Sequence, residues 1–212
     1  PIQKGTADFS KGNRFKDLKA LQAMPLARRL GNLGLSFLIK VASGYWNVFD
    51  PTNGFTAINN DIIKNIDLNK LSKRYFFESS LLIEIYYANA VVKDVTMKAN
   101  YGDEVSSLSL TKTLFEFPPK LLYATLKRIV LKYFLFDFNI ASLYIIFGIP
   151  LFSWGLIYGI INYIYYSQSF IPAPTGTILI PTLAIILGFQ LLLSALSYDV
   201  NNYPKKENQW NH

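Results

Sequence analysis

The chain contains no cysteine, and its single histidine, His212, is the last residue. Without cysteine there is no disulfide, no thiolate nucleophile and no thiolate metal ligand, and the redox compartment stays undetermined. A terminal histidine is typical of an unstructured end. A Ser-His-Asp triad and a zinc-binding HExxH helix are therefore both excluded for this chain.

Motifs that bind nucleotides or diphosphates are also missing. No GxGxxG or GxxxxGK[ST] sequence precedes a helix, and no DxD pair is present that could grip a metal-bound diphosphate. Internal repeats and low-complexity segments are absent as well. The residues taken by themselves indicate no complete active site.

Charge is missing from one long part of the chain, because no charged residue occurs between Asp137 and Asp199. The gap holds two apolar runs, about 138–166 and about 177–198, and each reaches the roughly 20 residues that a helix needs to cross a bilayer. We predict a transmembrane hairpin over 138–199, with Gly155 and Gly159 as a close-packing face. Two buried helices of a soluble core are the alternative.

Basic residues flank this predicted hairpin, and the reversal between its two runs has none. They are Lys120, Lys127, Arg128, Lys132, Lys205 and Lys206. The positive-inside rule then makes both ends cytoplasmic, including the tail 200–212, which predicts an integral membrane protein of the plasma membrane if the source is bacterial or archaeal. The net charge of +7 fits anionic lipid better than nucleic acid, because the cations cluster beside the spans.

Residues 118–137 have the pattern of an amphipathic helix next to the membrane. Pro118 and Pro119 mark its start, and the cations alternate with apolar residues at helical spacing. We expect this helix to lie in the headgroup layer of the bilayer. The alternative is a helix packed against its own domain.

The remaining part, residues 1–117, alternates helical and strand patterns. A helix is expected from about residue 16, broken near Met24-Pro25 and ended by Gly44. GFTAI predicts a short buried strand, NNDIIKNIDLN a short capped helix, YFFESSLLIEIYYAN a second amphipathic helix, and AVVKDVTMKANYG a strand. This order predicts an α/β domain with only part of a sheet.

The stretch VFDPTNGFTAI contains a polar turn, DPTNG, between the first helix and the short strand. Asp-Pro and Asn-Gly both favour turns, because proline fixes φ and asparagine or glycine accepts positive φ. The residues allow two interpretations: a turn alone, or a turn that holds a ligand.

Several segments in order resemble the second half of family 2 glycosyltransferases. They are ADFSKGNRF, ARRLGNLGLSFL, DPTNGFTAI, YFFESSLLIEI, VVKDVTMKANYGDEVSSL and the terminal hairpin. The nearest type is the polyprenyl-phosphate sugar transferase, as in dolichol-phosphate mannosyltransferase and bacterial prenyl-phosphate glucosyltransferase, and the resemblance runs from about Ala7 to Tyr198. It implies a partial GT-A-type α/β domain over 1–117, without the nucleotide-binding half, so that this chain alone is expected to be inactive.

The resemblance also implies a reaction. The family moves a hexose from a nucleotide sugar to a polyprenyl (undecaprenyl or dolichyl) phosphate by inverting displacement. Mg or Mn is normally held by an acidic motif upstream, so no metal ligand is expected in this chain. The partners would be the two substrates and the bilayer. The resemblance is also compatible with a homo-oligomer. A non-catalytic membrane scaffold that kept the fold, and a transferase with a polysaccharide acceptor, are the alternatives.

Residue roles follow from the same resemblance. Glu78 matches the acidic residue near the transferring sugar and is the expected catalytic residue, although Ser80 stands where many relatives carry a second acid. Lys98 likewise stands where mannosyl-transferring members often have arginine. The role of Lys11 and Arg14 in KGNRF stays open. The expected substrate-binding residues are Asp50, Asn53 and Gly54 of the turn, Arg28 or Arg29 for phosphate, and Lys98, Tyr101 and Ser106 in the segment that closes over the site. For Arg28 and Arg29 the alternative is a basic helix face that lies against the membrane.

Overall fold

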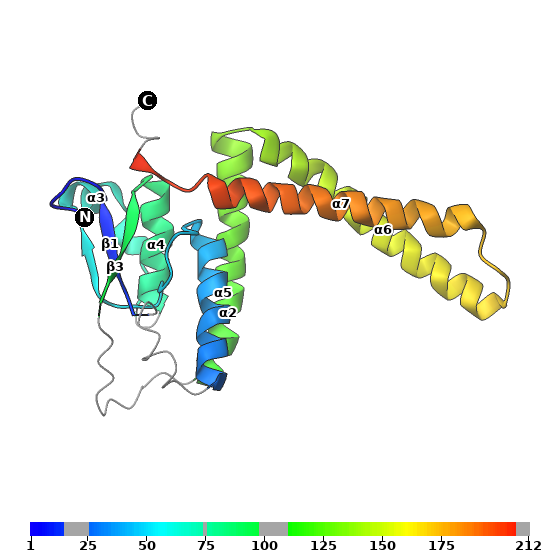
Figure 1. Cartoon of the computed structure of the whole chain (residues 1–212), viewed down its shortest axis with the longest axis horizontal. Helices are drawn as coiled ribbons and strands as arrows, with labels where there is room; N and C mark the ends of the chain where they lie inside the picture. Colours follow the sequence, from blue (N-terminus) through cyan, green and yellow to red (C-terminus); the bar gives the residue numbers. More distant parts are fainter. Residues whose placement is uncertain (15–25, 74–75, 98–109, 207–212) are drawn as a thin grey trace. The chain divides into compact units, whose positions relative to one another are not determined.

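The computed structural model describes residues 1–14, 26–73, 76–97 and 110–206, without the side chains of 27–28 and 110–115. The chain forms two compact units, one of Pro1–Arg128 with Tyr203–His212 and one of Ile129–Asn202. Figure 1 shows the sheet and its helices in the first unit and two long helices in the second. The prediction of a mixed α/β part followed by a pair of long apolar helices is therefore confirmed.

The sheet of the first unit has three strands in the order β2-β1-β3. The strands are β1 (Phe9–Asn13), β2 (Thr56–Ile58) and β3 (Val92–Thr96). Strand β1 pairs with β2 antiparallel and with β3 parallel, and the second pairing sets Lys11 opposite Asp94. The central strand is β1, which the strand patterns in the sequence did not predict.

Strand β1 was missed because FSKGN contains few residues that favour strands. Its position between two partners buries all five residues, so sheet pairing overrides local preference. The prediction of a buried strand at GFTAI was wrong in its burial: β2 is an edge strand in which Thr56 and Ala57 are exposed. An edge strand has one neighbour and leaves its outer side to solvent.

Four α-helices belong wholly or mainly to this unit, within the described residues. They are α2 (Leu26–Ser43), α3 (Asn60–Asn65), α4 (Phe77–Tyr87) and α5 (Leu110–Val130), with a 3₁₀ turn η1 at Leu68–Lys70. Asn59 caps α3 as predicted, since its side chain accepts a hydrogen bond from the Asp61 N–H. Helix α4 was expected to be amphipathic, but it buries residues around most of its circumference because it lies within the core.

Gly44 ends α2, as the sequence predicts. It has φ +78°, and a Cβ at this position would come within 2.6 Å of the Tyr86 ring. Tyr45 follows it with a fully buried ring, and its hydroxyl donates to the Ala90 carbonyl at 2.6 Å. Burial raises the pKa of Tyr45 well above its ordinary value. This corner therefore connects the end of α2 to the start of β3.

Helix α5 differs from its prediction in where it starts and in what it contacts. It begins at Leu110, and Pro118 and Pro119 lie inside it. Two prolines are typical of a first helical turn, which is why they indicated a start. One face of α5 packs into the core through Phe117, Leu121 and Ala124, so packing against its own domain, the alternative, is correct for that face.

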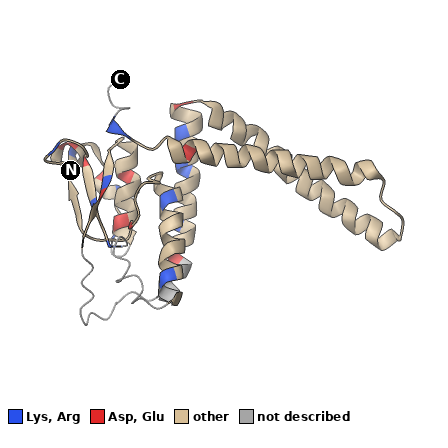
Figure 2. Ribbon diagram, viewed as in Figure 1, with Lys and Arg blue, Asp and Glu red and all other residues tan. Residues whose placement is uncertain are grey.

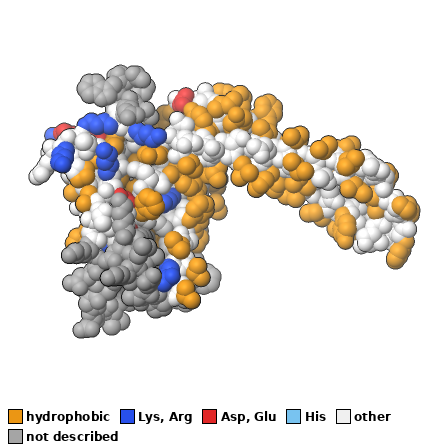
Figure 3. Space-filling model, viewed as in Figure 1, with side chains coloured by type: hydrophobic (Ala, Val, Ile, Leu, Met, Phe, Trp, Pro, Cys, Tyr) orange, Lys and Arg blue, Asp and Glu red, His pale blue; other side chains and the backbone are white. Residues whose placement is uncertain are grey.

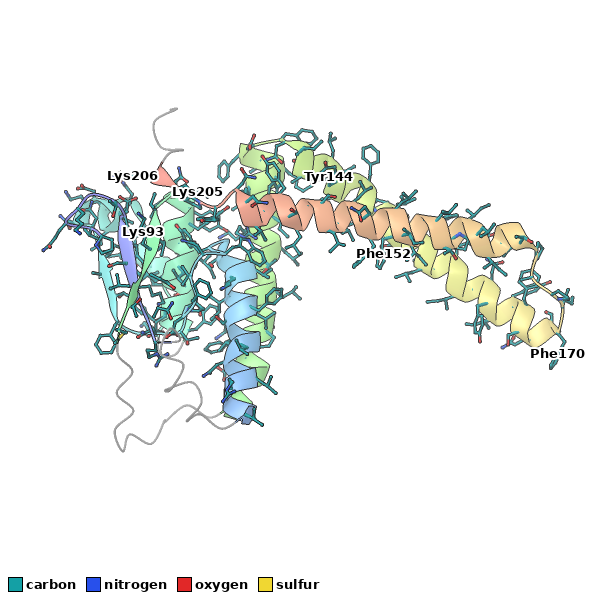
Figure 4. All side chains as sticks on the ribbon, in the orientation of Figure 1. Lys93, Tyr144, Phe152, Phe170, Lys205 and Lys206 are labelled. Carbon is teal, nitrogen blue, oxygen red and sulfur yellow. The ribbon has the colours of Figure 1, made fainter. Side chains whose placement is uncertain are left out.

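The second unit consists of the π-helix η3 (Leu131–Phe136) and the helices α6 (Ile140–Ser169) and α7 (Thr175–Asn201). Both long helices are apolar enough to cross a membrane by length and composition. Figure 2 shows no charged residue along α6, and Phe170 lies at the reversal between the helices in Figure 4. The pair is compatible with the predicted hairpin.

Glycines bring α6 and α7 into close contact. A Cβ at Gly155 would lie 3.0 Å from the Pro181 carbonyl oxygen, which confirms that residue's predicted place in a packing face. A Cβ at Gly188 of α7 would lie 2.5 Å from the Phe152 backbone nitrogen, a contact that the sequence did not indicate. Small residues allow such backbone approach between helices in lipid.

Polar contacts connect η3 to the end of α7. The buried Asp199 carboxylate accepts hydrogen bonds from the Tyr133 hydroxyl and, at 3.2 Å, from the Lys132 ammonium. At the start of α6, Asn139 accepts a hydrogen bond from the Ala141 N–H at 2.9 Å and caps the helix. These contacts satisfy polar groups where the unit begins and ends.

Candidate functional site

The candidate site lies where the parallel strands β1 and β3 end. Lys11 and Asn13 of β1 and Asp94 of β3 point to the same side of the sheet, because Lys11 is opposite Asp94 and side chains alternate along a strand. In open α/β sheets, ligands bind beyond the carboxyl ends of parallel strands. The polar residues of this edge are therefore the first candidates for ligand contact.

The polar turn DPTNG packs against β1 through Asn53. The Asn53 side chain donates to the Gly12 carbonyl at 2.9 Å and accepts from the Phe55 N–H at 3.0 Å, and only 2% of Asn53 is exposed. The Gly12 N–H donates back to the Phe55 carbonyl at 2.9 Å. A Cβ at Gly12 would lie 2.9 Å from the Asn53 amide nitrogen, so glycine is needed for this approach.

Asp50 attaches the start of the turn to the residue after β1. Its fully buried carboxylate accepts from Arg14 twice, with Nε–Oδ2 at 2.8 Å and Nη2–Oδ1 at 3.1 Å. The Thr52 hydroxyl also donates to Asp50 Oδ1 at 3.2 Å. A bidentate pair of this kind is short, directional and charge-assisted. The Arg14 side chain keeps 29% of its surface exposed and is therefore the solvent-facing member.

Glu78 faces the same turn from the first turn of α4. A Cβ at Gly54 would lie 3.6 Å from Glu78 Oε1, and Gly54 itself is exposed. The absence of a side chain at Gly54 therefore leaves open space in front of the Glu78 carboxylate. Glu78 is partly exposed and lies in the first turn of α4.

Lys11 is the buried cation of this region. It is 1% exposed, and its Nζ has no hydrogen-bond partner in the part of the chain that the structure describes. Burial lowers the pKa of Lys11 to about 8, against the opposing effect of the Glu78, Asp50 and Asp94 carboxylates. The ammonium therefore lies within the electrostatic range of all three acids without an ion pair to any of them.

Asp94 joins β3 to both β1 and the turn. Its Oδ2 accepts from the Asn13 amide at 2.8 Å and from the Phe49 N–H at 2.9 Å. Burial raises the pKa of Asp94, although these two hydrogen bonds oppose the shift. Lys40 of α2 lies nearby, with its ammonium 4.6 Å from the centre of the Phe49 ring, and burial lowers the pKa of Lys40.

The structure thus brings four of the predicted site residues together: Asp50, Asn53, Gly54 and Glu78. Arg29 lies in α2 and is partly buried. The Arg28 side chain and the residues Lys98, Tyr101 and Ser106 lie outside the described parts, so their predicted roles stay predictions.

Sequence reasoning did not assign site roles to Lys11, Asn13, Arg14 or Asp94. The only signal was the density of polar residues in KGNRF, whose first three residues prove to belong to the buried strand β1. Ser80, which stands in place of an expected acid, is also buried. Its hydroxyl accepts from the Ser72 N–H at 2.9 Å and donates to the Phe77 carbonyl at 2.8 Å.

The described residues do not fit a metal site. Nowhere in those ranges do three His, Cys, Asp or Glu side chains gather in a way that could hold a metal ion. Asp50 and Asp94 are each committed to hydrogen-bond donors of the chain, which leaves them poorly placed as ligands. A metal would need ligands from elsewhere.

No protein-family profile matches this chain, and no solved structure matches it. Two curated proteins of methanogens do. The chain is 31% identical over 103 residues, 49% of its length and 41% of the relative's, to UDP-N-acetylglucosamine–dolichyl-phosphate N-acetylglucosaminyltransferase of Methanococcus voltae. It is 33% identical over 96 residues, 45% of its length and 39% of the relative's, to an uncharacterised protein of Methanocaldococcus jannaschii.

Each match spans about two fifths of the curated relative's length. The named relative is a glycosyltransferase, and the similarity is distant and covers half of this chain. The chain is therefore a glycosyltransferase-related protein with two helices that could cross a membrane.

Proposed function

We propose that the protein is a membrane-bound family 2 glycosyltransferase that moves a hexose from a nucleotide sugar to a polyprenyl phosphate. The observation that carries this proposal is the 31% identity over 103 residues to a protein named for transfer from UDP-N-acetylglucosamine to dolichyl phosphate. The chain would supply the acceptor-side part of a GT-A-type domain together with the membrane hairpin.

The proposed transfer calls for a carboxylate near the sugar, and the polar edge of the sheet has one. In the reaction, a phosphate oxygen of the acceptor forms a bond to the anomeric carbon, and the bond from that carbon to the leaving diphosphate breaks with its electron pair. A phosphate is already anionic near neutral pH, so little proton abstraction is required. A carboxylate near the anomeric carbon would instead stabilise the positive charge that develops on the sugar in the transition state.

Glu78 fits that role in the proposal. It is the partly exposed carboxylate beside the exposed Gly54, whereas Asp50 is fully buried in its pair with Arg14. Asp50 and Asn53 then act as positioning residues, because their polar atoms hold the turn against β1. Precise placement of reacting groups accounts for a large part of enzymatic rate acceleration.

The phosphate groups need cations or N–H donors. Arg28 or Arg29, Lys98, Tyr101 and Ser106 remain our proposed donors, and Arg14 joins them because its guanidinium is partly exposed at the same edge. Mg²⁺ or Mn²⁺ would neutralise the leaving diphosphate when bound, with ligands outside the described residues. The hairpin would hold the domain at the membrane that contains the lipid chain of the acceptor. Both ends of the chain would be cytoplasmic.

The experiment is a transfer assay on membranes that carry the protein expressed from its complete gene. Radiolabelled nucleotide sugars are supplied one at a time, with and without added polyprenyl phosphate. We expect label to appear in an organic-extractable lipid and to increase with added lipid phosphate. Label in a water-soluble polymer would favour a polysaccharide acceptor, and no product with any common donor would contradict the proposal.

A further inference from the structure

Lys11 places a cation in the interior of the first unit. It occupies the middle of the central strand β1 and is 1% exposed. Figure 3 shows other Lys and Arg side chains on the outer surface of this unit, where water solvates them. The Lys11 ammonium has no hydrogen-bond partner among the described residues. Because a lysine is almost never fully buried unless it is paired, this position calls for an explanation.

The burial of Lys11 lowers the stability of the fold. Its ammonium loses hydration without gaining an ion pair, and burial lowers its pKa to about 8. An apolar side chain of similar size would avoid this cost. Residues that reduce stability in this way concentrate at functional sites, where a polar group is held ready for a ligand.

A second buried polar atom near Lys11 also lacks a partner. Asp94 lies opposite Lys11 in the parallel pairing of β1 with β3. Its Oδ2 accepts hydrogen bonds from Asn13 and the Phe49 N–H, but its Oδ1 is buried with no hydrogen bond in the described part of the chain. The Lys11 ammonium and this oxygen do not pair with each other. An unpartnered donor and an unpartnered acceptor therefore lie in the same part of the sheet.

The chemistry of these two atoms favours a neutral hydroxyl group as the ligand. An ammonium only donates hydrogen bonds and a carboxylate only accepts them, whereas a hydroxyl does both. An anion is disfavoured at Lys11, because the carboxylates of Glu78, Asp50 and Asp94 all act on this ammonium and Arg14 is the cation that opposes them. A phosphate placed here would meet an excess of negative charge.

We propose that the Lys11 ammonium binds a hydroxyl group of the transferred sugar, and that this hydroxyl donates a hydrogen bond to a neighbouring carboxylate. The identity of the ligand as a sugar rests on the proposed glycosyl transfer. The sugar can approach from the side of the turn, since Gly54 leaves open space in front of Glu78. The flexible four-carbon stem of lysine lets the ammonium adjust to the hydroxyl. Lys11 would then select sugars that carry this hydroxyl.

Binding of nucleotide sugars tests this proposal separately from transfer. Isothermal titration calorimetry on the purified protein from the complete gene gives dissociation constants for the common nucleotide sugars. The one that binds most tightly is then compared with its monodeoxy analogues, each of which lacks one sugar hydroxyl, in the wild type and in Lys11→Met. Lys93→Met is the matched control, because Lys93 is an exposed lysine of the same sheet (Figure 4). Thermal unfolding verifies that each variant is folded.

We expect one monodeoxy analogue to bind the wild type about tenfold or more weakly than the parent sugar, because it leaves the buried ammonium without a partner. Lys11→Met should bind the parent about tenfold more weakly and should no longer distinguish it from that analogue. Lys93→Met should behave like the wild type.

Two results would overturn the proposal: an unchanged affinity of Lys11→Met for the parent sugar, or an equal loss of affinity for the parent and every analogue. The second result would assign Lys11 a structural role only. If the wild type distinguishes the analogue but transfers no sugar in the membrane assay, the proposed transfer fails and the hydroxyl contact stands. A wild-type protein that binds no nucleotide sugar would contradict both.

Discussion

Arg14, the residue after the central strand, holds the fully buried carboxylate of Asp50 through two parallel contacts, at 2.8 Å and 3.1 Å. The contact spans thirty-six positions of sequence and fixes the turn DPTNG to the strand that it covers. The polar side chains of Asp50 and Asn53 are therefore buried and hold the turn in place. Gly54 and the neighbouring Glu78 remain accessible to solvent.

The first prediction concerns this ion pair. We expect Asp50→Asn to lower the free energy of unfolding by about 3 kcal/mol, because removing one member of a buried pair leaves the other uncompensated. Thermal unfolding of the detergent-solubilised protein measures the effect. Thr52→Val removes one hydrogen bond to the same carboxylate and should cost only about 1 kcal/mol. Equal losses in the two variants would show that the Arg14 pair is not the main stabilising contact.

The second prediction concerns the buried Lys11. Its pKa falls from 10.5 to about 8 on folding, so between these pH values the unfolded chain binds more protons than the folded one. The free energy of unfolding therefore rises with pH across this window, by up to about 3 kcal/mol, and the full cost of the buried ammonium applies below it.

We accordingly expect Lys11→Met to stabilise the protein near pH 7 and to lose that advantage between pH 8 and pH 10.5. Denaturant midpoints measured across this range test the expectation, and Lys93→Met on the exposed side of β3 controls for the loss of a lysine from the sheet. A Lys11→Met advantage that stays constant with pH would show that burial of charge is not its cause.

The third prediction concerns the helix pair. We expect Gly188→Val to separate α6 from α7 and to reduce the yield of folded protein, because a Cβ at this position would lie 2.5 Å from the Phe152 nitrogen and no backbone atom can yield so far. Gly176→Val at the start of α7 is the control, since a Cβ there meets nothing within 4 Å. Size-exclusion profiles in detergent compare the two. Similar profiles for both variants would contradict this packing of the hairpin.

Parts of the structure with a clear apolar period could be predicted from sequence. The charge-free runs indicated α6 and α7, Gly44 indicated the end of α2, and Asn59 indicated the start of α3. Strand β1 could not be predicted in this way, because its five residues are buried by pairing with segments far along the chain. The start of α5 was missed because Pro118 and Pro119 favour a first turn when only local preference is considered.

The candidate site, too, could be predicted from the sequence only in part. The turn and Glu78 were indicated by a family resemblance, but their contacts are nonlocal. Asn53 reaches Gly12 across forty-one positions, and Asn13 reaches Asp94 across eighty-one. No local pattern encodes which strand a turn covers, so the roles of Lys11, Asn13 and Asp94 emerge only when the sheet is assembled.

We propose that the Glu78 carboxylate, which lies open beside Gly54, takes part in sugar transfer to a lipid phosphate. The most direct measurement is the initial rate of label transfer into organic-extractable lipid by membranes with the wild-type protein, Glu78→Gln or Glu84→Gln. Glu84 is the matched control because it lies on α4 as well but is not adjacent to Gly54 in the structure. We predict that Glu78→Gln lowers the rate by about 100-fold or more and that Glu84→Gln changes it less than about twofold. Equal rates for Glu78→Gln and the wild type, at equal amounts of folded protein, would contradict the account.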